Sequence, residues 1–231
     1  MDFWLSPTEW QAVFLSAKIA MWATLVMAPI AMVTAFLLVR REFPGKAVLN
    51  GLAHLPLILP PVVTGYVLLL LFGTQGPIGA VLQDYGIVLA FRWTGAALAA
   101  GVMAFPLMVR ALRLSLESVD ARLEQAAATL GASPAWIFVT VTLPLMLPGI
   151  LTGTILAFAK ALGEFGATIT FAANIPGQTQ TIPSAIYALL QVPGQENAVA
   201  RLVLISVVIA LTALFLSEAL AHRARKKLEG K

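Results

Sequence analysis

The sequence predicts an all-α membrane protein with about five transmembrane helices, a cytoplasmic helical segment and short re-entrant or interfacial segments. Hydrophobic residues make up 59% of the 231 residues and charged residues only 11%, whereas an ordinary soluble domain carries roughly 25% charged residues. The uncharged residues are gathered into runs, and a membrane-spanning helix needs about 20 such residues. The chain has room for these spans and their loops, but not for an additional soluble domain of ordinary size.

The apolar runs define five predicted spans, which cover residues 17–39, 49–72, 93–113, 142–163 and 198–219. In the first, no charge lies between Lys18 and Arg40, and a helix over that stretch reaches about 32 Å, enough to cross the hydrocarbon core. The second is expected to bend at Pro56, Pro60 and Pro61. These prolines free backbone groups that either line a solute pathway or merely form an architectural kink.

Two further apolar stretches, 76–91 and 181–192, are too short or too rich in glycine to cross a membrane. We expect them to form re-entrant or interfacial segments. The basic tail, 220–231, follows the last span directly, where a cluster of positive charge is typical of a cytoplasmic anchor rather than of a nucleic-acid-binding patch.

The distribution of Lys and Arg predicts how the spans are oriented. One face of the membrane receives four basic residues, Lys18, Arg92, Lys160 and Arg201. The other receives eleven, which are Arg40, Arg41, Lys46, Arg110, Arg113, Arg122, Arg223, Arg225, Lys226, Lys227 and Lys231. The richer face is expected to be cytoplasmic, so the N-terminus lies outside and the C-terminus inside a multi-pass protein.

The composition argues against several kinds of chemistry. The chain has no cysteine and only two histidines, His54 and His222, so we expect no metal site and no catalytic cysteine. No pair of candidate catalytic residues shares the middle of a span, so no enzyme activity is expected. His54 is interpreted as a packed or interfacial side chain rather than a proton relay.

The longest cytoplasmic segment, 118–140, is predicted to contain two short helices separated by Gly131. Asp120 is expected to cap the first helix, and Ser133 with Pro134 to begin the second. The alanines at 126–128 leave much of the first helix without bulky side chains, which would let it sit in a groove of another protein. The alternative is that these alanines only favour helix formation.

This segment resembles the cytoplasmic signature of ABC importer permeases. The matching residues are Ala126, Ala127, Gly131, Leu143 and Pro144. The resemblance implies that residues 11–219 form an importer transmembrane domain and that the signature is a coupling helix, which seats in a separate ATPase subunit. Glu124 and Gln125 belong to the same candidate ATPase-coupling set. Gln125, however, stands where the family usually has Glu, which weakens any role for a carboxylate at that position.

Nucleotide binding is expected to belong to the partner. The chain contains no G-x-x-x-x-G-K-[ST] phosphate loop, since Gly45 and Lys46 are followed by Ala47. The resemblance therefore implies that ATP and Mg are bound by the ATPase subunit and that this chain binds no cofactor.

Three longer stretches, 43–66, 105–120 and 161–187, resemble the molybdate importer permeases of the inner membrane. The resemblance implies ATP-driven import of molybdate, and of tungstate as well. It also implies a homodimer that works with two ATPase subunits and an external anion-binding protein. Sulfate permeases share the same outline, so a sulfate or thiosulfate permease is the alternative. A secondary transporter driven by an ion gradient is less favoured, because spans two and three carry no acid or base at mid-depth.

The outer end of span four offers two kinds of candidate residue. Lys160 and Glu164 are spaced to pair on one helix face, and we interpret them as a structural ion pair rather than an anion site. The residues that follow carry hydroxyl and amide groups, which either bind a passing anion weakly or are ordinary polar loop residues. These are Thr168, Thr170, Asn174, Thr179, Thr181 and Ser184.

Overall fold

The computed structural model of the protein describes residues 5–228, and the regular structure in this part of the chain consists of helices, without strands. In chain order the helices are α1 Pro7–Arg40, α2 Lys46–Ile58, α3 Pro61–Phe72, α4 Pro77–Asp84, α5 Trp93–Glu117, α6 Ala121–Thr129, α7 Pro134–Ile137, the π-helix η1 Phe138–Thr142, α8 Leu143–Leu162, α9 Gly166–Ala172, α10 Ile182–Leu189 and α11 Glu196–Leu228.

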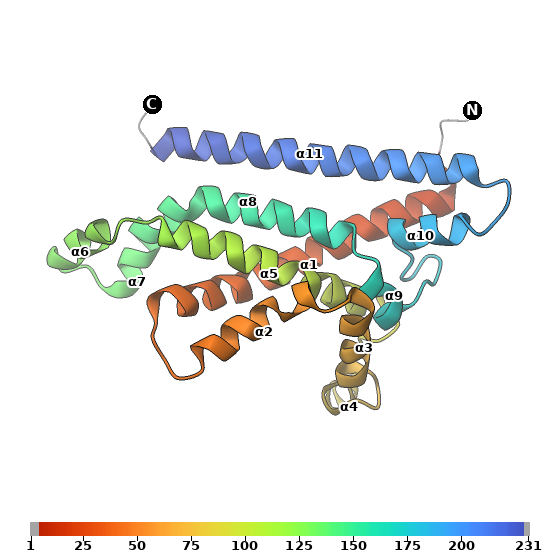
Figure 1. Ribbon diagram of the computed structural model, residues 1–231, viewed down its shortest axis with the longest axis horizontal. Helices are drawn as coiled ribbons and strands as arrows, with labels where there is room; N and C mark the ends of the chain where they lie inside the picture. The colour runs from red at the N-terminus through yellow and green to blue at the C-terminus, as the bar shows by residue number, and fades with distance from the viewer. Residues whose placement is uncertain (1–4, 229–231) are drawn as a thin grey trace.

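The long helices α1, α5, α8 and α11 run along the longest axis of the molecule, with α11 at one edge (Figure 1). The short helices α6 and α7 lie at one end of this bundle, and α9 and α10 lie towards the other. Within residues 5–228, four helical stretches are long and apolar enough to cross a membrane, and a fifth is added if α2 and α3 form one span. The predicted fold class, with about five spans, is confirmed.

The second predicted span is divided into two helices. α2 and α3 meet at an angle of 119°, a geometry that fits either a broken span or a re-entrant loop. The break lies at Leu59, which is extended, and Pro60, which is not helical, and Pro61 then starts α3. A residue before proline avoids the helical region, so two successive prolines stop α2. Pro56 lies inside α2 without ending it.

The helix ends differ from the predicted bounds at several places. α1 begins ten residues before the predicted start of the first span at 17, because Ser6 and Glu9 form a capping box at its N-terminus. The described part of α11 continues to Leu228, well beyond 219. The stretches 76–91 and 181–192 contain the short helices α4 and α10, as expected for segments that do not cross. Residues 229–231 of the basic tail lie outside the described residues.

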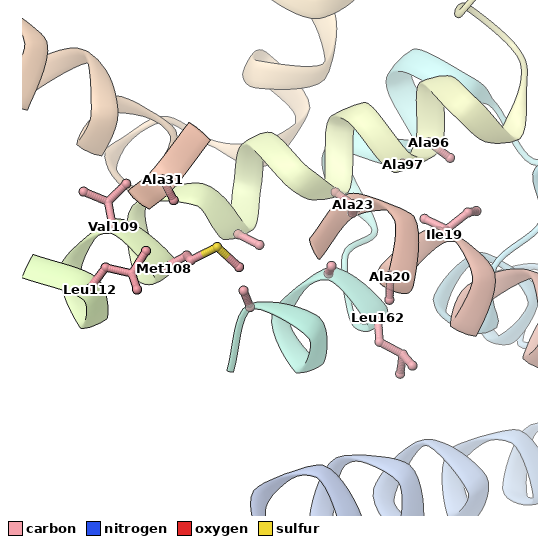
Figure 2. Close-up of a cluster of buried hydrophobic side chains, with 14 of the residues drawn as sticks. Ile19, Ala20, Ala23, Ala31, Ala96, Ala97, Met108, Val109, Leu112 and Leu162 are labelled. Carbon is pink, nitrogen blue, oxygen red and sulfur yellow. The ribbon is translucent and has the colours of Figure 1, made fainter. Parts of the chain in front are cut away.

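The core is built largely from alanine. Figure 2 shows Ala23 of α1 near Ala97 of α5, and Ala31 of α1 beside Val109 of α5. These alanines are buried, as are Ala20 and Ala96. Small side chains let helices approach closely, which is how helices associate in a membrane, where burial of apolar surface gives little driving force. Larger side chains fill the ends of the cluster, among them Ile19, Met108, Val109, Leu112 and Leu162 (Figure 2). This core fixes α1 and α5 as the frame that carries the segment 118–140.

Candidate functional site

The segment 118–140, hereafter called the docking segment after the role proposed for it below, has the helix caps that the sequence predicts. The Asp120 carboxylate accepts a hydrogen bond from the Arg122 backbone N–H at 2.9 Å and caps α6. Ser133 precedes α7, and its hydroxyl accepts a bond from the Trp136 N–H at 3.4 Å. Pro134 occupies the first turn of α7. These capping predictions are confirmed.

Gly131 ends α6 through a Schellman motif. Its φ is +83°, and its N–H donates to the Ala128 carbonyl while the N–H of Ala132 donates to the Ala127 carbonyl. No residue of α6 is buried, and Leu130 beside the glycine is 88% exposed. The end of α6 therefore projects from the helical bundle with its surface uncovered in the single chain.

Glu124 faces the rest of the protein from within the docking segment. Its carboxylate accepts a bond from the Arg40 guanidinium at 2.9 Å and another from the Thr142 hydroxyl at 2.6 Å. Arg40 is the last residue of α1, and Thr142 is the last residue of η1 and 2% exposed. One side chain thus ties α6 to α1 and to the start of α8.

Gln125, the neighbour of Glu124, is exposed. The carboxylate that contacts the rest of the fold is therefore that of Glu124. The other predicted coupling residues, Leu143 and Pro144, open α8 directly after η1. A single-turn π-helix inside a longer helix occurs frequently at functional sites. Sequence reasoning missed Arg40 and Thr142 as partners of Glu124, and Arg40 was counted only for its positive charge.

Lys160 and Glu164 form an ion pair at the far end of α8, with 2.7 Å between the Lys160 Nζ and a Glu164 carboxylate oxygen. Glu164 is 2% exposed, and its second oxygen accepts a bond from the Ala167 N–H at the start of α9. The buried carboxylate therefore has partners for both oxygens, and it also orders the turn between α8 and α9.

Most of the candidate pathway hydroxyls donate to the backbone nearby. Thr168 donates to the carbonyls of Glu164 and Phe165, and Thr170 donates to that of Gly166. The Ser184 hydroxyl donates to the Thr181 carbonyl and accepts from the Thr181 N–H. These groups cap or brace α9 and α10, and their hydrogens are not directed at a passing solute.

Thr179 and Asn174 lie in the loop between α9 and α10. The Thr179 hydroxyl donates to the Ala173 carbonyl and accepts from the Ile175 N–H. Asn174 donates weakly to the Ser184 carbonyl at 3.5 Å, and its buried side-chain oxygen has no hydrogen-bond partner in the described structure. Ala173 beside it has a φ of +63°, a conformation that costs a residue with a Cβ of order 1–3 kcal/mol.

The short helix α3 crosses α9 at very close range. A Cβ placed on Gly65 would lie 2.6 Å from the Ala167 carbonyl oxygen and 2.9 Å from the Thr170 Cβ. A Cβ on Gly166 would lie 2.6 Å from the Pro61 Cβ. The sequence places glycine at both contact points, and this allows α3 to pack directly on the segment after Glu164.

Comparisons with known proteins agree with this architecture. Residues 7–226 match the family model described as "Binding-protein-dependent transport system inner membrane component". The molybdenum transport system permease protein ModB of Escherichia coli strain K12 is 58% identical, over 96% of this chain and 98% of that protein. ModB of Haemophilus influenzae is 53% identical, over 95% and 96% of the two chains.

A solved structure has the same fold. A subunit of a bacterial ABC transporter that imports the acidic polysaccharide alginate superposes with a TM-score of 0.70 at 15% identity, over 96% of this chain and 80% of that one.

Within residues 5–228, no group of three or more His, Cys, Asp or Glu side chains is arranged to hold a metal ion.

Proposed function

Because this chain belongs to the family of binding-protein-dependent transport system inner membrane components, we propose that it is the permease subunit of an ATP-driven importer of molybdate and tungstate. The observation that supports this substrate is the likeness, over nearly the whole chain, to permeases named for molybdenum transport. The composition and the long apolar helices agree with a multi-pass position in the inner membrane.

The proposed assembly is a homodimer with two ATPase subunits on the cytoplasmic side and a binding protein that delivers the anion from outside. The ATPase subunits bind ATP and Mg, and α6 of each permease seats in a groove on one of them. Closure of the ATPase pair on ATP then moves the docking segments and opens the pathway outward, and hydrolysis reverses the movement. The exposed surface of α6 and the bonds of Glu124 to α1 and η1 support this coupling role.

Transport assays with the complete importer test the substrate. Cells that express permease, ATPase and binding protein are expected to take up labelled molybdate, and unlabelled tungstate is expected to compete about as well as unlabelled molybdate. Sulfate should compete weakly, because a site that fits one oxyanion discriminates by size and hydrogen-bonding geometry. Equal competition by sulfate would identify a sulfate permease, and uptake in matched cells without the ATPase would identify a secondary transporter.

Reporter fusions test the proposed orientation. Fusions at residues 45 and 225 are expected to report a cytoplasmic position, and fusions at residues 8 and 178 an external one, since loops rich in Lys and Arg remain on the cytoplasmic side. Residue 8 lies in the first turn of α1 and residue 45 lies just beyond its end, so these two fusions give the most direct comparison. A cytoplasmic signal at residue 8 would contradict both the external N-terminus and the five-span arrangement.

A further inference from the structure

A cavity of about 670 Å³ lies between α5 and α8. Its lining includes Arg110, Ser115 and Ser118 of the α5 end that leads into the docking segment, and Thr152 on α8. No Asp or Glu contributes to the lining. The volume accommodates a small oxyanion together with several waters, each of which takes up about 30 Å³.

Arg110 is the basic group of this cavity, and its charge is not neutralised by the chain. Among the described residues it forms no ion pair and no side-chain hydrogen bond, whereas Arg113, one turn along the helix, donates to Asn50 at 2.7 Å and pairs with Glu117 at 3.7 Å. A guanidinium group carries five N–H donors in a planar fork, which matches the geometry of an oxyanion. The N–H donors of Arg110 therefore remain available to bind an anion.

The hydroxyl groups around Arg110 already donate to backbone carbonyls, so they are not free to donate to an anion. Ser115 donates to the Met146 carbonyl at 3.1 Å, and Thr152 donates to the Pro148 carbonyl at 2.9 Å. After span four, the hydroxyls of Thr168, Thr170 and Ser184 likewise donate to backbone carbonyls. A dianion that leaves water needs positive charge or free donors along its route, and in this cavity Arg110 provides both.

We propose that Arg110 is an anion-binding residue in the cytoplasmic half of the transport pathway, and that the ligand is a hydrated tetrahedral oxyanion. The inference rests on the proposed function, because it takes the cavity between α5 and α8 to be part of the pathway. A single exposed arginine binds an anion weakly, and weak binding allows the anion to be released into the cytoplasm.

The absence of cysteine from the chain allows a direct test by labelling of the assembled importer. Thr152→Cys places one thiol in the cavity, on the helix opposite Arg110. A negatively charged methanethiosulfonate reagent is expected to react faster than a positively charged one. Arg110→Gln should lower this rate ratio about 25-fold, because the negatively charged reagent loses the attraction of one unit charge at close range in water and the positively charged reagent loses the equal repulsion, each worth about fivefold. The matched variant Arg113→Gln should leave the ratio unchanged, because Arg113 does not line the cavity.

Protection by anions provides the second measurement. Molybdate, tungstate or sulfate should slow labelling of Thr152→Cys when Arg110 is present and not in Arg110→Gln, with chloride at matched ionic strength as the control. An unlabelled thiol in the assembled importer, an unchanged rate ratio in Arg110→Gln, or the lack of protection by all three oxyanions would each overturn the proposal. These labelling results do not depend on uptake, so a failure of molybdate transport in the parent protein would count against the proposed function and not against Arg110.

Discussion

Gly131→Asp is expected to remove most ATP-driven uptake while the chain still inserts into the membrane. The φ of +83° strains any residue with a Cβ, at a cost of roughly 1–2 kcal/mol. The new side chain also adds bulk and charge at the exposed end of α6, in what we propose is a fitted groove of the ATPase. Apart from Gly131 and its two chain neighbours, no residue comes within 4 Å of the added Cβ, so the rest of the fold should be unaffected. Uptake is expected to fall about tenfold or more, as a loss of 1.4 kcal/mol in docking would produce.

Gly194→Asp is the matched control for this experiment. Gly194 has a φ of +84°, and its Cβ would also meet nothing within 4 Å, but it lies in the loop between α10 and α11, away from the docking segment. Both variants therefore introduce the same strain. Ala127→Glu in α6 should act like Gly131→Asp. The measurements are uptake, ATP hydrolysis and co-purification of the ATPase. Wild-type uptake by an inserted Gly131→Asp variant would disprove the coupling role of α6.

Gly65→Ala is expected to destabilise the folded protein strongly for so small a change. The added Cβ would lie 2.6 Å from a backbone oxygen and 2.9 Å from a backbone Cα of Ala167, and neither atom can move away by a rotamer change. Overpacking of this kind typically costs about 1–3 kcal/mol. The midpoint of thermal unfolding in detergent should fall, together with the yield of the purified assembly.

Gly51→Ala provides the comparison for Gly65→Ala. Gly51 lies inside α2, the other half of the broken span, and a Cβ there would meet nothing within 4 Å. Replacing glycine inside a helix by alanine is expected to be neutral or slightly stabilising. Equal unfolding midpoints for the two variants would mean that α3 does not pack on α9 as described.

The spans were predictable from the sequence because the hydrocarbon core demands long uncharged helices, and hydropathy measures that requirement directly. The break in the second span was only partly predictable. Pro56, Pro60 and Pro61 look alike as residues, yet α2 continues through Pro56 and ends at the consecutive pair. The 119° angle between the two helices depends on how α3 packs against α9, and no local pattern specifies that.

In the candidate site, too, local features could be predicted from the sequence, whereas contacts between distant residues could not. The caps of α6 and α7 are local, so Asp120, Gly131 and Ser133 were identified correctly from neighbouring residues. The contact between Arg40 and Glu124 joins positions 84 residues apart, and short-range patterns do not encode it. The hydroxyl groups after span four were visible as residue types, but whether a hydroxyl binds the backbone or remains free depends on where each short helix begins.

Helix α1 is held by an ion pair at each of its ends. Near its start Glu9, which is 4% exposed, accepts bonds from Arg201 of α11, with 2.9 Å to the nearest guanidinium nitrogen, and its last residue, Arg40, pairs with Glu124 of α6. The helix has 34 residues and is therefore about 51 Å long. The two ion pairs therefore connect α6 to α11 through the whole length of α1, so a shift of α6 along the axis of α1 is expected to load the contact between Glu9 and Arg201.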